Sequence, residues 1–347
     1  MKAVVFHGPG ELRYEELPVP TPGEGEALVK IEAALTCGTD VKTFRRGHPV
    51  MIPRVPTVFG HELAGTVTAV GRGVTAVREG DRVVAANSAP CGECPLCRAE
   101  RPNLCQDLLF VNGAYGEYIA LPPRLTAKNL VVLGGAVPAG RAAFAEPLAC
   151  ALHGIERGRV ERGQTVAVFG HGPLGCLLAM VAGARKARVL LVGKTGLRLE
   201  RVRALGLAEC LDATAGDPVA QLRALTGGRG VDVAVDATGR PEVWEQAIQS
   251  VARGGTVVFF GGCAPGTLVR LDTRRAHYDE LTLVGAFHHT PGLIRAAVRC
   301  LESQEVVPDV LITHRMALAQ VPEALELMAR GEALKVLIRP NTEGEDR

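Results

Sequence analysis

The feature that most constrains this chain is an alternation of short apolar runs and helical segments in its second half. Five runs have the character of buried strands and occupy residues 165–169, 188–192, 231–235, 256–260 and 281–285. Helical segments are expected between them at 174–184, 197–205 and 243–252. Strands that are apolar along their whole length are typical of a parallel sheet covered on both faces. This half is therefore predicted to form a doubly wound α/β domain.

The turn after the first of these strands carries a glycine pattern. It matches G-x-G-x-x-G, with the residues Gly170, His171, Gly172, Pro173, Leu174 and Gly175. The first glycine of such a turn permits a tight bend, the second lets the backbone approach a pyrophosphate, and the third lets the helix pack close to the strand. The helix N-terminus then offers N–H groups and a positive dipole end to the anion. We predict a dinucleotide-binding turn; the alternative is a glycine-rich turn that binds nothing.

The end of the second strand bears on which dinucleotide is bound. NAD sites usually place Asp or Glu there, where the carboxylate holds the ribose 2′-hydroxyl. This chain has Gly193 and Lys194 instead, and Arg198 follows in the next helix. Space beside the glycine and two positive charges suit a 2′-phosphate. NADP is therefore favoured over NAD, with use of both cofactors as the alternative.

The first 120 residues have a different character. Strand-like runs at 28–35, 63–70 and 81–85 are separated by clusters of Gly and Pro, which predicts an irregular, β-rich domain. The last part of the chain ends in an apolar run at 336–338, as expected of a chain that returns to the first domain. A length of 347 residues also suits two domains rather than one.

Composition excludes several classes of partner. A formal net charge of +2 lacks the basic excess that nucleic-acid phosphates require. No apolar run approaches the roughly 18–20 residues of a membrane span, and the N-terminus lacks the pattern of a signal peptide. We expect a cytoplasmic protein that binds neither nucleic acid nor membrane.

Four of the ten cysteines are clustered. They follow the pattern C-x2-C-x2-C-x7-C and are Cys91, Cys94, Cys97 and Cys105. In a reducing compartment such a cluster is typical of a metal site. Four thiolates complete the tetrahedral shell of Zn²⁺ and leave no open position. We predict a structural zinc; free thiols in a loop are the alternative.

A second set of metal-binding side chains is dispersed along the chain. Cys37 ends one predicted strand, and His61 and Glu62 begin another. Glu146 lies at the expected domain border. A catalytic zinc takes three protein ligands and leaves one position for water or substrate. Cys37 and His61 are natural ligands, and Glu62 and Glu146 are the two candidates for the third.

Taken together, these motifs resemble those of the zinc-dependent medium-chain dehydrogenases of the alcohol and polyol family. The resemblance covers nearly the whole chain and rests, in the family's order, on Cys37-Gly38-Thr39-Asp40, Gly60-His61-Glu62, Cys91 to Cys105, Glu146-Pro147-Leu148 and Gly170 to Gly175. It implies a GroES-like catalytic domain, residues 1–148 and 286–347, split around a Rossmann domain at 149–285. The Glu-Pro-Leu form is more similar to the sorbitol, threonine and related secondary-alcohol branch than to the animal ethanol branch.

The resemblance also implies roles for residues near Cys37. Thr39 matches the hydroxyl that takes the substrate's proton, and Asp40 matches a partner of the zinc-bound histidine. Many relatives have a histidine three residues after this threonine as the outer member of the proton relay; this chain has Lys42. Either Lys42 passes the proton onward, or the proton travels through the cofactor ribose and water.

The implied activity is hydride transfer between a secondary alcohol or polyol and NADP or NAD. The resemblance implies one catalytic and one structural Zn²⁺ per chain, a small alcohol or ketone as substrate, and a homodimer or homotetramer. Two alternatives stay open. One is an L-threonine-like amino-alcohol dehydrogenase, and the other is a catalytically inactive relative that keeps zinc for its structure.

Overall fold

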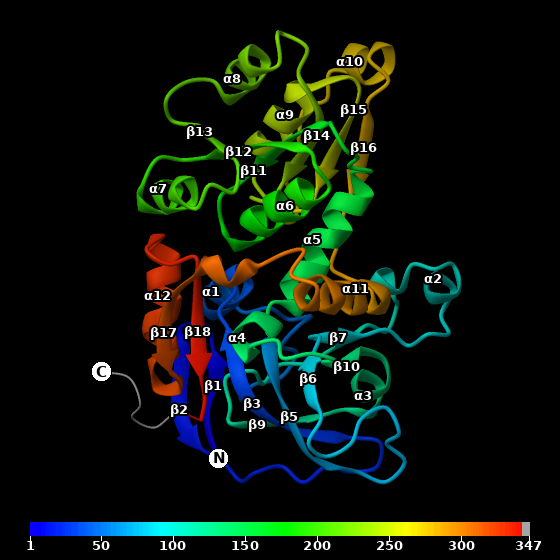
Figure 1. Ribbon diagram of the computed structural model, residues 1–347, viewed down its shortest axis with the longest axis vertical. Coiled ribbons are helices and arrows are strands. Elements are labelled where there is room, and N and C mark those ends of the chain that lie inside the picture. The colour runs from blue at the N-terminus through cyan, green and yellow to red at the C-terminus, as the bar shows by residue number, and fades with distance from the viewer. Residues whose placement is uncertain (342–347) are drawn as a thin grey trace. The chain divides into compact units, whose positions relative to one another are not determined.

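The computed structural model describes residues 1–341, which form two compact units (Figure 1). Unit 1 consists of Met1–Ala149 and the C-terminal part of the chain from His289, and unit 2 consists of Cys150–His288. The last six residues of the expected segment 286–347 lie outside the described residues. Within residues 1–341, no helix combines the length and apolar character that crossing a membrane requires.

A parallel sheet is the centre of unit 2. Its strands are β11 (Thr165–Phe169), β12 (Arg188–Gly193), β13 (Glu209–Asp212), β14 (Val231–Asp236), β15 (Val251–Phe259) and β16 (Thr282–Gly285). They lie side by side in the order β13-β12-β11-β14-β15-β16, with every pairing parallel. All of β11 is buried, as its apolar run predicts. The strand order reverses between β11 and β14, and in such sheets ligands bind beyond the carboxyl ends of the strands at this point.

The helices of unit 2 alternate with these strands along the chain. They are α6 (Pro173–Ala184), α7 (Leu197–Ala204), α8 (Pro218–Leu225), α9 (Pro241–Ser250) and α10 (Thr273–Tyr278). A further helix, α5 (Ala145–Arg157), contains the boundary between the two units. This strand-and-helix alternation is the doubly wound arrangement that the sequence predicts.

Two features of unit 2 differ from the sequence prediction. β13, α8 and α10 were not expected; β13 reads Glu-Cys-Leu-Asp and lacks a continuous apolar run. The helix expected over 243–252 ends at Ser250, and Val251 already opens β15. The pairing of β15 with β14 shifts register, and Gly254 has a φ of +71°. A bulge of this kind lengthens a strand without leaving a regular alternation in the sequence.

Unit 1 is mainly antiparallel. Its strands are β1 (Lys2–Gly8), β2 (Glu11–Glu16), β3 (Ala27–Leu35), β4 (Thr57–Val58), β5 (Glu62–Val70), β6 (Arg82–Ala85), β7 (Ser88–Ala89), β8 (Leu109–Phe110), β9 (Tyr118–Leu121), β10 (Leu130–Val132), β17 (Ile312–Ala317) and β18 (Lys335–Arg339). The largest sheet has the order β10-β6-β5-β3-β18-β17, and β9 also pairs with β3. The strand nearest the C-terminus, β18, thus lies directly beside β3.

Short helices complete unit 1. They are α1 (Gly38–Arg46), α2 (Pro95–Arg98), α3 (Pro123–Asn129), α4 (Ala139–Ala142), α11 (Pro291–Glu302) and α12 (Val321–Arg330). The buried residues of α12 join the core formed by the N-terminal strands. Unit 1 is therefore closed by segments from both ends of the chain.

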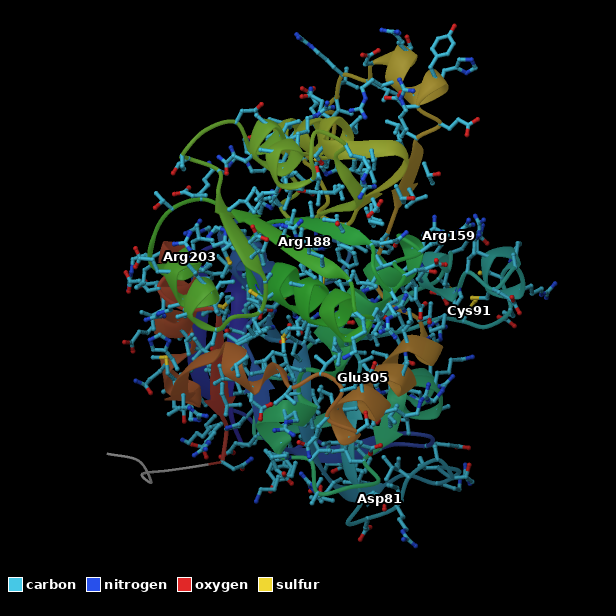
Figure 2. All side chains as sticks on the ribbon, turned by 45° about the horizontal axis from the view of Figure 1, so that its top comes forward. Asp81, Cys91, Arg159, Arg188, Arg203 and Glu305 are labelled. Atoms are coloured by element: carbon cyan, nitrogen blue, oxygen red, sulfur yellow. The ribbon has the colours of Figure 1, made fainter. Side chains whose placement is uncertain are left out.

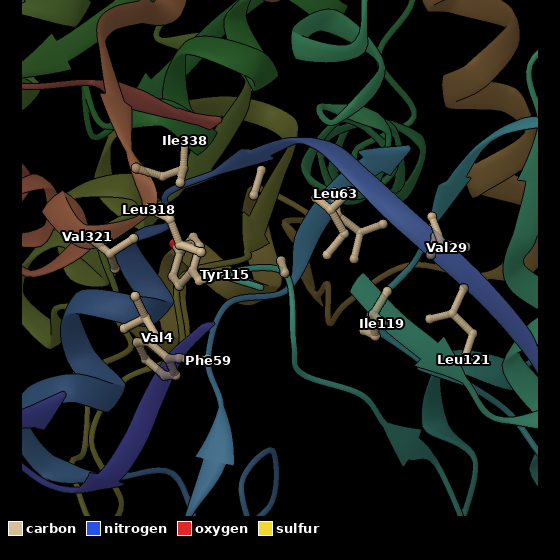
Figure 3. Packing of buried hydrophobic residues seen from close by; sticks show 14 of the residues in the cluster. Val4, Val29, Phe59, Leu63, Tyr115, Ile119, Leu121, Leu318, Val321 and Ile338 are labelled. Atoms are coloured by element: carbon tan, nitrogen blue, oxygen red, sulfur yellow. The ribbon is translucent and has the colours of Figure 1, made fainter. Parts of the chain in front are cut away.

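An aromatic group anchors this core (Figure 3). The rings of Phe6 and Phe59 stack with centroids 5.2 Å apart, and Phe59 meets Tyr115 edge-on at 5.9 Å. Figure 3 shows Tyr115 beside Leu318 and Ile338. Tyr115 is fully buried, so its hydroxyl needs a polar partner inside the protein.

Candidate active site and metal centres

The four-cysteine segment forms a lobe between β7 and β8 that contains α2; Figure 2 labels Cys91 in this lobe. The Sγ atom of Cys91 lies 3.4 Å from that of Cys105 and 3.9 Å from that of Cys97. The Sγ atoms of Cys94 and Cys105 are also 3.9 Å apart. Four sulfurs bound tetrahedrally at about 2.3 Å from zinc lie about 3.8 Å from one another. The donor set therefore fits a closed four-thiolate zinc site.

Positive and polar groups face the sulfurs of this lobe. The backbone N–H of Cys94 donates to Sγ of Cys91 at 3.3 Å. A Cβ atom added to Gly92 would lie 2.6 Å from Nζ of Lys128, so glycine leaves room for this ammonium group. A hydrogen bond to Asp107 is the main cause that raises the pKa of Arg124, and the charges of Cys91 and Cys105 add to the shift. Both cations lie on α3, where they offset the negative charge of clustered thiolates.

Strand pairing brings the second donor set together. β3 and β5 are antiparallel, with Leu35 at the end of β3 opposite Glu62 at the start of β5. Cys37 follows Leu35 by two residues and His61 precedes Glu62, so this register alone brings thiol and imidazole close. One ligand atom from each of Cys37, His61 and Glu62 lies within 4.8 Å of the other two. A thiolate, an imidazole and a carboxylate at this spacing fit a zinc ion with one open position.

Asp40 connects the members of this cluster. Its Oδ2 accepts the backbone N–H of Cys37 at 2.8 Å and the hydroxyl of Tyr115 at 2.6 Å. Its Oδ1 lies 2.9 Å from Nδ1 of His61, which leaves Nε2 as the ring nitrogen for a metal ion. Burial disfavours the imidazolium, but the Asp40 carboxylate outweighs burial and raises the pKa of His61 above its usual range.

Glu62 is paired with a buried lysine. Lys335 donates to both carboxylate oxygens, with Nζ 2.5 Å from Oε1, and neither side chain is more than 1% exposed. β18 carries Lys335 into the cluster because it pairs with β3. Burial raises the pKa of Glu62 to about 7, while Lys335 opposes the shift and Glu146 adds to it. Each carboxylate oxygen has two lone pairs, so Glu62 retains capacity for a metal ion beside its bonds to Lys335.

The two candidate carboxylates occupy different surroundings. Glu146 is buried in the first turn of α5, and the donor atoms grouped with Cys37 and His61 do not include it. Its Oε1 lies 3.8 Å from Nε2 of His289. The geometry thus groups Glu62 with the thiol and the imidazole, while Glu146 lies beside His289 and close enough to Glu62 to raise its pKa.

The two proposed relay residues lie on α1. Thr39 is half-buried in the first turn, and its backbone N–H donates to Sγ of Cys37 at 3.4 Å. Lys42, one turn further along, is exposed. Within residues 1–341 no carboxylate forms an ion pair with Lys42.

The glycine turn opens α6 in unit 2. Gly170 follows β11 with a φ of +112°, which favours glycine. Gly172 is the N-cap and Pro173 begins the helix. A Cβ atom on Gly175 would lie 1.8 Å from the carbonyl oxygen of Gly170, so a larger residue would separate helix and turn. The N–H groups of Leu174 and Gly175 belong to the first turn, which lacks intrahelical acceptors, and are therefore suited to a phosphate.

The side chains near Gly193 are arranged around His171. A Cβ atom on Gly193 would lie 2.4 Å from Nδ1 of His171. Burial, reinforced by the charge of Arg198, lowers the pKa of His171 to about 4. Arg198 is thus close enough for its charge to affect His171 of the glycine turn, whereas Lys194 is exposed. The space beside Gly193 is partly filled by an uncharged imidazole.

Sequence reasoning missed three residues that shape these sites. Lys335 and Arg339 flank the apolar residues 336–338 of β18, and a charge at the start of a strand that enters the core is a signal that was available. Asp212 ends β13 opposite Gly193, and its Oδ1 accepts the N–H of Thr195 at 3.1 Å. No local pattern marks Tyr115, whose hydroxyl is brought to Asp40 by the core alone.

Comparison with known proteins gives concordant results. The family model described as "Alcohol dehydrogenase GroES-like domain" matches residues 23–131, and "Zinc-binding dehydrogenase" matches residues 173–303. Sorbitol dehydrogenase of Bacillus subtilis is 31% identical over 98% of each chain. L-Galactonate-5-dehydrogenase of Escherichia coli is 31% identical over 94% of each chain. A zinc-binding dehydrogenase from Sinorhizobium meliloti, solved with NADP bound, is 30% identical with a TM-score of 0.88, covering 98% of this chain and 99% of that chain.

Unit 2 has a parallel sheet with a glycine turn, and unit 1 has two donor sets that contain cysteine. Together these features define a zinc-dependent, nucleotide-dependent oxidoreductase. The chain belongs to the family of zinc-dependent medium-chain alcohol and polyol dehydrogenases, and it is an enzyme. The predicted fold class, a GroES-like β-rich domain with a Rossmann domain, is confirmed.

Proposed function

We propose that this enzyme transfers a hydride between a secondary alcohol or polyol and a nicotinamide cofactor. In this proposal residues 1–148 and 286–347 form the catalytic domain and residues 149–285 the nucleotide-binding domain. The observation that carries it is the grouping of Cys37, His61 and Glu62 within 4.8 Å of one another. An inactive relative would have no need to keep this donor set intact and oriented by Asp40.

The residues of the cluster would have different parts in binding a metal ion. When bound, zinc supplies Lewis acidity at the substrate oxygen, and the nicotinamide exchanges the hydride. Cys37, His61 and Glu62 would hold the ion, while Asp40 keeps Nδ1 of His61 engaged and Nε2 directed to the metal. Lys335 balances the buried charge of Glu62. The four cysteines of the lobe would hold a second, structural zinc.

Thr39 is proposed to accept the proton of the reacting hydroxyl. The exposure of Lys42 supports an onward path through the cofactor ribose and water. A positioned acid or base contributes typically 10²–10⁴-fold to the rate. We therefore expect Lys42→Met to change kcat by less than about tenfold. A loss of 10²-fold or more, with an altered pH profile, would instead assign the relay to Lys42.

NADP is the proposed cofactor, with NAD as the second. Gly193, Arg198 and Lys194 support it, as does the relative solved with NADP. Arg198→Met should raise KM for NADP more than KM for NAD, whereas the exposed Arg203→Met on the same helix should alter neither. Gly193→Asp alone would collide with His171. The double variant Gly193→Asp, His171→Ala is the better test of a shift towards NAD.

Two further features of the proposal concern the whole molecule. None of the ten cysteines, all within residues 1–341, forms a disulfide, which supports a reducing compartment such as the cytoplasm. The exposed Leu268 and Tyr278, in the segment that connects β15 to the edge strand β16, support a homodimer or homotetramer. Analytical ultracentrifugation would determine the subunit number.

Zinc content and a substrate panel test the proposed function together. We expect two zinc ions per chain and turnover of secondary alcohols or polyols, read as absorbance of the reduced nicotinamide. One zinc and no turnover of any alcohol would indicate the inactive relative. Turnover of L-threonine in preference to all polyols would indicate the amino-alcohol dehydrogenase.

A further inference from the structure

An open pocket lies in unit 1 on the segment that leads into His61. Its volume is about 360 Å³, and it is lined by Met51, Ile52, Pro53, Arg54, Thr57, Phe110 and Asn112. This volume is within the range of small-molecule sites. The lining combines apolar side chains with one guanidinium, one amide and one hydroxyl, which is the composition expected for a small polar ligand with a carbon skeleton.

Hydrogen bonds connect the wall of this pocket to Gly60, the residue directly before His61. Asn112 donates from Nδ2 to the carbonyl of Met51 at 2.8 Å, so the two sides of the pocket are joined. The next residue, Gly113, donates its N–H to the carbonyl of Gly60 at 2.8 Å, directly before His61. On the other side, the N–H of Met51 donates to Nδ1 of His48 at 3.1 Å. The pocket is therefore built on the same backbone framework that positions His61.

The segment that forms one wall is positively charged and lacks compensating acids. Residues 41–60 contain no Asp or Glu, and their Lys and Arg residues are Lys42, Arg45, Arg46 and Arg54. Within residues 1–341 none of these four cations has a carboxylate within ion-pair distance. Other arginines of the chain do, such as Arg141 with Asp309 at 2.8 Å. Of the four, Arg54 alone lines the pocket.

We propose that Arg54 binds a substrate carboxylate, and that the preferred substrates are polyhydroxy monocarboxylic acids of the aldonate type. This inference rests on the proposed function, because it assumes that a carbinol of the same molecule reacts at the Cys37–His61–Glu62 cluster. That carbinol is oxidised to a ketone, the cofactor gains the hydride and a proton is released, while the carboxylate is unchanged.

The chemistry of the lining suits such a molecule. A guanidinium presents paired N–H donors that match the two oxygens of a carboxylate. Thr57 and Asn112 supply hydrogen-bonding groups for hydroxyls, and Met51 and Phe110 supply apolar surface for the carbon chain. Arg54 is exposed, so its guanidinium stays hydrated when a neutral polyol binds, and the acid alone gains an ion pair there.

The test compares matched pairs of substrates on the zinc-loaded enzyme. The probes are D-gluconate with D-glucitol and D-ribonate with ribitol, each measured with saturating NADP and NAD. The wild-type enzyme should have a higher kcat/KM for each acid than for its polyol. Arg54→Met should lower kcat/KM for the acids by about 10- to 100-fold, as expected for a hydrogen bond to a charged group. It should thereby remove most of the preference for each acid over its polyol, and change the cofactor KM by less than about twofold.

Two matched variants sharpen the assignment. Arg54→Lys keeps the charge but not the paired donors, so it should retain part of the preference for acids. Arg45→Met removes one cation from the same segment outside the pocket and should retain the full preference. An equal loss in Arg45→Met and Arg54→Met, or a rise of the cofactor KM in Arg54→Met, would overturn the inference in favour of a diffuse field that acts on cofactor phosphates.

Calorimetric binding of D-gluconate separates this inference from the proposed function. If polyols are turned over and gluconate neither binds nor reacts, the carboxylate site is wrong and the function stands. If gluconate binds to the wild type and not to Arg54→Met while no alcohol is turned over, the carboxylate site stands and the function fails. If gluconate neither binds nor reacts and no alcohol is turned over, both fail.

Discussion

The two donor sets of unit 1 are built in contrasting ways. The four-cysteine lobe takes all its sulfurs from residues 91–105, and two cations of the single helix α3, Arg124 and Lys128, lie close to it. The second set takes its donors from α1 and the start of β5, and its supports from residues far away in sequence. Tyr115 lies 75 positions from Asp40, and Lys335 lies 273 positions from Glu62. A site assembled from one loop depends on that loop, whereas a site assembled at strand ends depends on the whole fold of its unit.

The largest effects are expected when one cysteine is removed from each donor set. Cys37→Ala should lower turnover on the order of 10³-fold or more, because several kcal/mol of charge stabilisation at the substrate oxygen are lost, and leave the thermal midpoint nearly unchanged. Cys97→Ser should lower the thermal midpoint and retain activity in the fraction that stays folded. Each variant should lose one zinc per chain by elemental analysis. Near-normal turnover in Cys37→Ala would refute the catalytic role of the second set.

Removal of the buried lysine should have the next largest effect. In the metal-free protein, Lys335→Met removes the buried ammonium partner of Glu62, and breaking a buried ion pair in this way typically destabilises by about 3–5 kcal/mol. The double variant Lys335→Met, Glu62→Gln should recover most of this loss in urea unfolding, because the carboxylate that lost its partner is then absent. If the double variant is as unstable as the single one, packing and not charge compensation is the role of Lys335.

A smaller effect is expected at Tyr115. Tyr115→Phe removes a buried hydrogen bond to the Asp40 carboxylate, a contact worth about 1.5–3 kcal/mol. It should also weaken zinc binding at the second set by about 10- to 100-fold, the usual effect of losing a residue that orients a metal ligand. The four-cysteine zinc should be retained, and Tyr118→Phe on β9 serves as the matched control. Equal zinc loss from both sets would contradict the separation between them.

The smallest effect is expected from a substitution of His171. This residue lies outside both donor sets, so both zinc ions should be retained. Burial and Arg198 lower the pKa of His171 to about 4, below the ordinary value of 6.5. The unfolded chain therefore binds a proton at this histidine that the folded chain does not, and stability falls as pH decreases from about 6.5 towards 4. The difference in thermal midpoint between pH 7 and pH 5 should be smaller in His171→Gln than in the wild type. An equal difference in both would show that other groups dominate this pH range.

Several features could be predicted from short-range patterns. The continuous apolar runs predicted five of the six strands of the parallel sheet. The glycine spacing at Gly170, Gly172 and Gly175 indicated a turn whose close packing the structure bears out. β13 escaped prediction because a four-residue strand of mixed polarity leaves no period to detect. The bulge in β15 could not be predicted from the sequence, because it depends on pairing with β14.

The two metal sites differ in the same way, because one is marked by a local pattern and the other depends on strand pairing. Spacing within one loop was enough to indicate the four-cysteine set, because chain connectivity already keeps residues 91–105 together. The sequence could indicate Cys37 and His61 as zinc ligands, but it left Glu62 and Glu146 as equal candidates for the third ligand. The register between β3 and β5 and the position of β18 beside β3 place Glu62 and Lys335 at the cluster. Residues hundreds of positions apart meet only when burial of the shared core sets the order and register of the strands, and no local pattern records that outcome.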